Sequence, residues 1–466
     1  MIDLNCWTGK ESKLLYSLRN VYSFPLDAKF TTATVYGGVE IDNHVVVDAV
    51  KFLKKSSIRA SEVESHKKYF DIQSKENLRD TFEFLVSHGI TCSHAVVRNP
   101  QLYNELLAIA KPMQQDVPFA GSQATRYATA LSFMGIRSSL FTSMKRKSRH
   151  ALPSNISVYG KEVTTHVDSI VLQWPANVEW GETASQTKPG ILHLTPSFGQ
   201  EMSLVSNIIT KSITSQEKEQ ALLVIGDLHS IVALESENRE LAIREVIQNL
   251  EKLPKGLKVH LELGSGLEPL MLHMPKLFSL VHSIGTHERD LDEITRAFKG
   301  PHTDLWHASV PLSKGVVWVV DILRHVFKQL ANKKSSRLSR VFFQSPSFHL
   351  VVNRRKEWIF SESGLAASSL MQTKFLCNCE EPHADSHDIR VPDYFPVATI
   401  PKSNQGHILS LDVRDPVAMW MEDNDLSYYF VPVLVGEGAL SSDRIIGLRE
   451  SVSAAFLANS AYNFTN

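Results

Sequence analysis

The chain has little cysteine and no long apolar run. It contains four cysteines among 466 residues, too few for the disulfide frameworks that stabilise small secreted domains. No uninterrupted apolar stretch reaches the roughly 20 residues that a membrane-spanning helix needs. We therefore expect neither a structural disulfide network nor a membrane span.

An excess of charge of either sign is also absent. Lys plus Arg total 49 and Asp plus Glu total 50, which leaves a formal net charge of -1. This balance argues against a globally basic nucleic-acid-binding protein. The first residues, MIDLNCWTGKESKLL, contain no cationic segment followed by an apolar one, so we expect no secretory signal. The simplest prediction for its location is the cytoplasm, with the nucleus as an alternative.

From about residue 220 onward, the sequence alternates regularly between strand and helix patterns. The run ALLVIGD (221–227) is typical of a strand buried on both faces, and SENRELAIREVIQNLEKL after it carries one apolar helical stripe. KVHLELG (258–264) and LVHSIG (280–285) are further strand patterns. Strands that alternate with helices predict a doubly wound, mostly parallel sheet with helices on both faces.

The first half of the chain is less regular. ISVYGKE and DSIVLQWPANVEWGE alternate as strands of a separate, half-exposed sheet would. At this length, two domains or one domain with a lid are expected. We predict a large α/β core at approximately 30–50, 112–145 and 190–466. A smaller, discontinuous, β-rich lid is predicted at approximately 51–111 and 150–189.

Polar residues follow several of the predicted strands. Open parallel sheets bind ligands beyond the carboxyl ends of their strands. The residues at those ends are therefore the candidates for function. They are Asp227, Glu262, the stretch Gly285–Asp290, Gln344 and the turn at Gly447.

Six segments in a fixed order suggest a family. They are GVEIDNHVVVDAVKFL, FAGSQA, LLVIGDLHSI, VHLELGS, SIGTHERDL and GLRESVSAAF. Together, over about Val35 to Phe456, they resemble the ADP-dependent glucokinase family, and its animal more than its archaeal members. The resemblance implies a ribokinase-like fold with a lid. It also implies an enzyme that uses ADP and Mg²⁺ to phosphorylate a sugar.

The resemblance assigns Glu262 and Asp290 to the magnesium site. Glu262 lies in the His-Leu-Glu signature, and Asp290 stands where the family has Glu. A carboxylate at a strand end can reach a hydrated cation that neutralises the nucleotide phosphates. In the alternative interpretation, Glu262 only caps a nearby helix and Asp290 is an ordinary acidic residue of a first helical turn.

The turn implied to hold the catalytic base departs from the family pattern. The family's Gly-x-Gly-Asp is Gly447-Leu448-Arg449-Glu450 here. Glu450 would be the base, but its extra methylene displaces the carboxylate by over ~1 Å, which can lower a rate ~100-fold. Arg449 carries a Cβ where glycine lets the backbone approach a phosphate, and its guanidinium could bind that phosphate or pair with Glu450. An ordinary helix N-terminus with surface charges is the alternative.

The positions implied to bind the sugar are also altered. Glu40 and His44 stand where the first strand of the family has Asn and Asp. Gly121-Ser122-Gln123 replaces Gly-Gly-Asn. A pocket that hydrogen-bonds one particular sugar tolerates such exchanges poorly, because each unpaired buried polar group is destabilising. These changes argue against glucose specificity.

The positions implied to bind the nucleotide depart less from the family pattern than those of the base and the sugar. FFQSPSFHL keeps His349, and Pro432 with Val433 could form an apolar slot for adenine. The alternative is a pair of buried core strands, which give the same apolar pattern.

Two features lie outside the resemblance. Cys377, Cys379, His383 and His387 are suitable zinc ligands by chemistry, but their spacing is not a standard one, and a polar loop is the alternative. The basic segment MKRKSRH (144–150) could contact RNA or an acidic protein partner, with a solvated loop as the alternative.

The altered functional turns predict a divergent, catalytically impaired family member that acts as a binding or regulatory protein. The rival hypothesis is an active ADP-dependent sugar kinase, in which Glu450 is the base and Glu262 with Asp290 holds Mg²⁺. A third hypothesis is an interaction scaffold that recruits its partner through the basic segment 144–150.

Overall fold

The computed structural model describes residues 32–462 with internal gaps. The residues left out of this range are 63–66, 91, 116–120, 161, 163–166, 182–183, 187–188, 198–220, 255, 265, 289, 304–311, 332–334, 346, 355–356, 378–393, 397–407, 411–415, 423–424 and 434–447. Gly447 and three of the four candidate zinc ligands (Cys379, His383 and His387) therefore lie outside the described residues.

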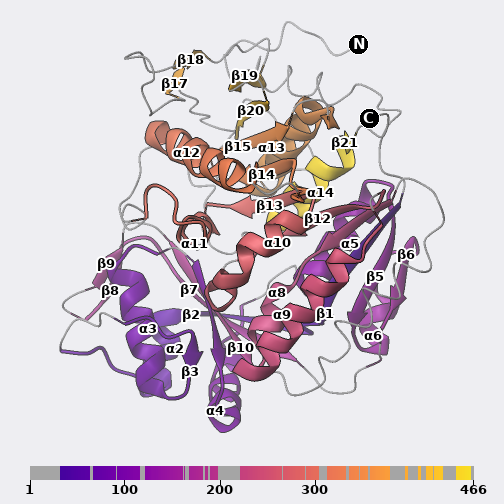
Figure 1. Ribbon diagram of the computed structural model, residues 1–466. Coiled ribbons are helices and arrows are strands. Elements are labelled where there is room, and N and C mark those ends of the chain that lie inside the picture. The colour runs from indigo at the N-terminus through magenta and orange to yellow at the C-terminus, as the bar shows by residue number, and fades with distance from the viewer. Residues whose placement is uncertain are drawn as a thin grey trace, which may run out of the picture.

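A ten-stranded sheet forms the larger part of the molecule (Figure 1). Its central strands pair in parallel, and three strands at one end pair antiparallel. The prediction of a mostly parallel sheet covered by helices is confirmed. In spatial order the strands are β19 (Ala418–Glu422), β20 (Leu426–Pro432), β15 (Phe348–Arg354), β14 (Arg340–Gln344), β13 (Ser283–His287), β12 (Lys258–Glu262), β11 (Ala221–Ile225), β1 (Thr32–Val39), β5 (Arg137–Ser143) and β6 (Ile156–Tyr159).

Helices cover the large sheet, and beside the site described below lie three of them, the last of which packs against the other two. These three are α5 (Gln123–Phe133), α13 (Ser361–Cys377) and α14 (Leu448–Asn459). Among the described helices, none is long and apolar enough to cross a membrane. The remaining helices of this part are α6 (Arg146–His150), α8 (Leu228–Val232), α9 (Ser236–Glu251), α10 (Met274–Leu280), α11 (Asp290–Ala297) and α12 (Leu312–Ala331), with a 3₁₀ turn η4 (Glu268–His273).

Sequence signals explain why these elements form where they do. Residues 222–225 of β11 are all buried, as a strand covered on both faces requires. Ser122 caps α5, because its hydroxyl accepts from the Thr125 N–H at the open end of the helix. Hydrogen bonds from the Gln123 and Ala124 N–H groups to Asp227 place the end of β11 and the start of α5 at the same edge of the sheet.

A separate five-stranded sheet lies beside the large one, at the lower left of Figure 1. Alternate side chains of its strands, including Val45 and Leu192, pack onto the helices that cover it. The intervening side chains include His44 and His94, and they face the larger part of the molecule, where they contact Gly121 and His229. This sheet contains β2 (Asn43–Asp48), β7 (Asp168–Trp174), β10 (Gly190–Pro196), β4 (Cys92–Val97) and β3 (Asp71–Ile72), with α2 (Ala49–Lys55), α3 (Lys75–Ser87), α4 (Pro100–Ala110) and η2 (Lys111–Met113).

The division into two sheets differs from the predicted boundaries at three strands. β2 and β10 fall within the ranges predicted for the large core but pair in the smaller sheet. β6 falls within the predicted lid but pairs with β5 of the large sheet. These assignments depend on pairing between residues far apart in the chain, which local patterns do not report.

Three short strand pairs complete the described structure. They are β16 (Trp358–Ile359) with β21 (Ala461–Tyr462), β17 (Tyr394–Pro396) with β18 (Ile408–Ser410), and β8 (Val178–Trp180) with β9 (Ala184–Gln186).

Candidate functional site

The carboxyl ends of four adjacent parallel strands meet at one edge of the large sheet. β1 ends just before Glu40, β11 just before Gly226 and Asp227, β12 at Glu262, and β13 at His287. The N-termini of α5 and α14 supply Arg126 and Arg449 to the same place. Most of the side chains predicted for the metal, base and sugar sites are therefore brought together here.

Arg449 occupies the position predicted for the metal ion. Its guanidinium donates to Glu262 through Nε (3.2 Å to Oε1) and to Asp290 through Nη2 (2.6 Å to Oδ2). Glu262 is fully buried and Asp290 is 1% exposed. Burial alone would lower the pKa of Arg449, but the carboxylates of Asp290 and Glu262 raise it above its ordinary value. The positive charge between the two carboxylates thus comes from the chain itself.

Both oxygens of Glu262 are engaged within the protein. Its second oxygen accepts from Ser453 Oγ at 2.6 Å and lies 3.0 Å from Nε2 of His260. It is the last residue of β12, inside the sheet, whereas the prediction placed it just past the strand. Gly285 on β13 leaves room for this carboxylate, since a Cβ there would lie 2.2 Å from Glu262 Oε2. Glu262 is thus a buried ion-pair partner in this structure, and its role as a metal ligand stays a prediction.

Asp290 combines the ion pair with a local role. Its Oδ2 accepts from the His287 backbone N–H at 2.8 Å, which ties the first residue of α11 to the end of β13. This agrees with the alternative of an acidic residue in a first helical turn. Among the residues that the structure describes, no three His, Cys, Asp or Glu side chains gather to hold a metal ion. With Arg449 between Glu262 and Asp290, the site as arranged in this structure does not fit Mg²⁺.

Glu450, the predicted base, is held in a second buried ion pair. Its carboxylate accepts from Nη2 of Arg126 at 2.7 Å, and it is 5% exposed. Burial raises the pKa of Glu450, but the charge and hydrogen bond of Arg126 outweigh burial and lower the pKa overall. An efficient general base has a pKa near the working pH. A carboxylate that is stabilised in its ionised form is a weak proton acceptor.

Arg126 connects this pair to the smaller sheet. It also donates to the backbone oxygen of Gly121, and its Nη1 lies 3.1 Å from Nε2 of His44 on β2. His44 in turn contacts Ser169 Oγ at 2.7 Å and the Gly121 oxygen at 3.0 Å. Burial and the nearby Arg126 lower the pKa of His44 to about 3, so this ring is neutral. The predicted sugar-site residues His44 and Gly121 are thus bonded within the protein.

Two carboxylates close the N-terminus of α5. Glu40 accepts from the Ser122 N–H at 3.1 Å and from the Ser122 hydroxyl at 3.0 Å. Asp227 accepts from the N–H groups of Gln123 (3.0 Å) and Ala124 (3.1 Å). The predicted sugar-site residues Glu40 and Ser122 therefore bind each other, and the neighbouring Gln123 binds Asp227 instead.

The residues predicted to bind the nucleotide lie within the core. Nδ1 of His349 lies 2.7 Å from Ser368 Oγ and Nε2 lies 2.7 Å from Gln372 Oε1. Burial lowers the pKa of His349 to about 4, so it is a neutral ring. The backbone groups of Pro432 and Val433 bond to Ser369 and Ser347. This geometry is the one expected from the alternative of buried core strands, and nucleotide binding by His349 stays a prediction.

Two residues of the site had no predicted role. Arg126 follows FAGSQAT in the first turn of α5, where the helix dipole disfavours a cation. That unfavourable placement was the available signal that a carboxylate lay nearby. Asp227 was recognised as a strand-end residue, but its partners on α5 are 103 and 104 residues away in sequence.

The basic segment 144–150 comprises α6 and the residues before it. Lys145 forms an ion pair with Asp42 (3.2 Å), and Arg149 donates to the Gly160 oxygen. Contact with RNA or an acidic protein stays a prediction.

The arrangement can now be compared with known proteins. The solved structure of an ADP-dependent kinase complex with fructose-6-phosphate and ADPbetaS shares the fold, with a TM-score of 0.63, 10% identity and 98% coverage of both chains. A reconstructed ancestor of ADP-dependent phosphofructokinases from Methanosarcinales shares it with a TM-score of 0.55, 13% identity and 98% coverage of both chains. The fold is thus that of the ADP-dependent kinases, as the resemblance implied.

The family follows from the sequence match. The family described as ADP-specific Phosphofructokinase/Glucokinase conserved region matches residues 33–458. The chain belongs to this family. The ADP-dependent glucokinase of Bos taurus is 23% identical over 429 residues, which are 90% of this chain and 82% of the relative. A probable ADP-dependent glucokinase of Caenorhabditis elegans is 28% identical over 257 residues, which are 52% of this chain and 49% of the relative.

The site predicts a pH dependence of stability through Glu40. Burial, the largest effect, raises the pKa of Glu40 from 4.5 to about 7, although the Thr125 hydrogen bond lowers it. The folded protein therefore holds a proton that the unfolded chain releases. This contribution, up to about 3 kcal/mol, is fully present below pH ~4.5 and is lost as the pH rises through about 7.

Glu40→Gln should remove this dependence. Urea unfolding at pH 5 and pH 8 should show a smaller loss of unfolding free energy for Glu40→Gln than for the wild type. Glu179→Gln, at an exposed carboxylate on β8, is the control and should keep the wild-type loss. Equal losses in Glu40→Gln and the wild type would contradict the assignment.

Proposed function

We propose that this chain is a divergent ADP-dependent glucokinase-like protein with impaired phosphoryl transfer, which acts as a binding or regulatory protein. The observation that carries the proposal is the position of Arg449 between Glu262 and Asp290. A fixed guanidinium supplies one positive charge to the protein's own carboxylates. It offsets one of their two negative charges and occupies the space between them, which opposes the binding of Mg²⁺ there.

The state of the candidate base supports the same proposal. Phosphoryl transfer of this kind depends on positioning and on stabilising developing charge, with a carboxylate to accept the proton of the attacking hydroxyl. Glu450 would have to leave Arg126 to reach a hydroxyl, and Arg126 would then remain buried without its main partner. Breaking such a buried pair is strongly unfavourable.

The rival is an active ADP-dependent sugar kinase that transfers the β-phosphoryl group of ADP to glucose or a related sugar with Mg²⁺. The names of the family and of the bovine relative favour it, and both carboxylates of the predicted metal site are retained at their strand ends. In this rival, ligand binding turns Arg449 out of the site.

An activity assay separates the two. Purified protein with Mg-ADP and a panel of sugars, including glucose and fructose 6-phosphate, is compared with the bovine relative. We expect turnover at least about 1,000-fold lower, because both the metal and the free base are lost. Turnover near that of the bovine relative that Glu450→Gln abolishes would contradict the proposal. Calorimetry with Mg-ADP then shows whether nucleotide binding survives.

A further inference from the structure

The smaller sheet contacts the larger part of the molecule at a second place, through Arg98. This residue follows β4, and its guanidinium donates to the backbone oxygens of Val232 (3.2 Å) and Ala233 (2.6 Å) at the end of α8. The same guanidinium donates to Ser197 Oγ at 3.0 Å and pairs with Asp71 at 2.7 Å. Its side chain is only 9% exposed. A cation at the C-terminus of a helix satisfies carbonyl groups that the helix itself leaves without a donor.

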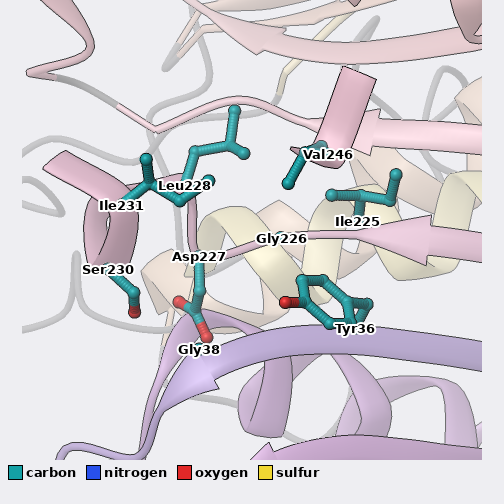
Figure 2. A pocket seen from close by; sticks show the side chains of 9 residues that line it. All are labelled: Tyr36, Gly38, Ile225, Gly226, Asp227, Leu228, Ser230, Ile231 and Val246. Carbon is teal, nitrogen blue, oxygen red and sulfur yellow. The ribbon is translucent and has the colours of Figure 1, made fainter. Parts of the chain in front are cut away.

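The helix that Arg98 contacts is fixed to the large sheet. Figure 2 shows Ser230 of α8 directed toward Gly38 of β1. A Cβ at Gly38 would lie 2.0 Å from Ser230 Oγ, so the glycine permits this close approach. Ile231 of the same helix lies with Val246 of α9 around a small cavity of about 10 Å³. Because α8 is packed in this way, Arg98 connects the smaller sheet directly to the large one.

Two histidines meet on the same helix, one from each part of the molecule. The ring of His94 on β4 lies 4.8 Å from the ring of His229 on α8, measured between centroids. Both rings pack against glycines of the segment after β12. A Cβ at Gly266 would lie 2.7 Å from His94 Cβ, and a Cβ at Gly264 would lie 1.8 Å from His229 Cε1. The two parts are therefore in close contact here.

We propose that Arg98 is a clasp, a side chain that keeps the smaller sheet closed against the large one in the ligand-free protein. All the partners named above belong to this chain, so closure needs no ligand. Opening separates the guanidinium from two helix carbonyls and parts His94 from His229. A molecule that binds between the two sheets therefore associates slowly, because the clasp has to open first. This inference does not depend on whether phosphoryl transfer is impaired.

Hydrogen exchange tests the clasp at groups that Arg98 does not touch. The N–H groups of Gly266 and Leu267 donate to the Glu293 carboxylate of α11 at 3.0 Å each, and Gly266 lies against His94. Arg98→Met removes the donors of the clasp but keeps an apolar stem. We expect exchange at both amides to be about tenfold faster in this variant, because the smaller sheet separates from them more often.

A second set of amides distinguishes opening from unfolding of the smaller sheet. Amides of β10 should exchange in Arg98→Met as they do in the wild type. Arg79→Met is the matched control, because Arg79 also pairs with an aspartate, Asp80 at 2.7 Å, but does so within α3. It should leave exchange at Gly266 and Leu267 unchanged. Wild-type exchange at these two amides in Arg98→Met, or an equal increase in Arg79→Met, would overturn the proposal.

Arg98→Lys covers the case in which Arg98→Met unfolds the smaller sheet. Lysine keeps a cation beside Asp71, but it has one nitrogen where three nitrogens of Arg98 contact Asp71, Val232 and Ala233. We expect exchange at Gly266 and Leu267 to be about threefold faster, with β10 unchanged. An increase at these amides that occurs only together with an equal one in β10, or no increase at all, would overturn the proposal.

Discussion

Replacing Arg449 by alanine is expected to create a divalent-cation site that the wild type lacks. The substitution leaves Glu262 and Asp290 buried without their common cation. Removal of one partner from a buried ion pair typically destabilises a protein by about 3–5 kcal/mol. In EDTA the variant should therefore melt well below the wild type. Mn²⁺ or Mg²⁺ at 100 times its dissociation constant should return about 2.7 kcal/mol of that loss.

The control for this experiment is Arg324→Ala. Arg324 also forms a largely buried ion pair, at 2.8 Å from Asp321 on the same helix, but it does not lie between two carboxylates of the site. It should be destabilised without any response to Mn²⁺. The explanation fails if Mn²⁺ stabilises the wild type as much as Arg449→Ala, or if Arg449→Ala is insensitive to both metals.

Replacing Arg126 by methionine is expected to have the second large effect. The change leaves the Glu450 carboxylate buried without its partner and also removes the donors to Gly121 and His44. We expect a loss of about 3–5 kcal/mol at pH 8. Chemical denaturation of the wild type and the variant measures it.

The pH dependence of this loss identifies its cause. In the wild type the pKa of Glu450 is lowered overall, because Arg126 outweighs burial, so its ion pair is intact from neutral pH down to below the usual carboxylate range. Without Arg126, burial should raise the pKa of Glu450 above its unfolded value. Protonation at pH 5 then relieves part of the penalty, and the gap between wild type and variant should be smaller at pH 5 than at pH 8.

Two further proteins check this interpretation. Arg126→Met with Glu450→Leu should be more stable than Arg126→Met alone, since no buried charge remains. Arg244→Met removes an exposed ion pair with Glu240 on α9 and should change stability by less than about 1 kcal/mol. A gap for Arg126→Met that is equal at both pH values would mean that packing, and not the charge of Glu450, explains the loss.

The fold was largely predictable because its signals are local. Aliphatic runs such as residues 221–225 and the helical stripe after them define strands and helices without knowledge of the tertiary structure. The order of the six motifs along the chain also indicated the family. The borders of the smaller sheet were not predictable in the same way. β10 belongs to it because it pairs with β4, where Ile191 lies opposite Cys92, and with β7 on its other side.

The site was predictable in position but not in its contacts. Topology alone brings Glu40, Asp227 and Glu262 to one edge of the sheet. Which charge neutralises which carboxylate depends on side chains more than 150 residues apart, such as Arg449 with Glu262 and Arg126 with Glu450. The sequence left open whether Arg449 binds a phosphate or pairs with Glu450. The structure instead pairs it with both carboxylates of the predicted metal site.

A crystal structure of the wild-type protein soaked with Mg-ADP tests the central claim most directly. The account predicts that Arg449 keeps its contacts with Glu262 and Asp290 and that no cation lies between these carboxylates, whether or not the nucleotide binds. A Mg²⁺ ion held at Glu262 and Asp290, with Arg449 turned away and Glu450 released from Arg126, would contradict it and support an active kinase.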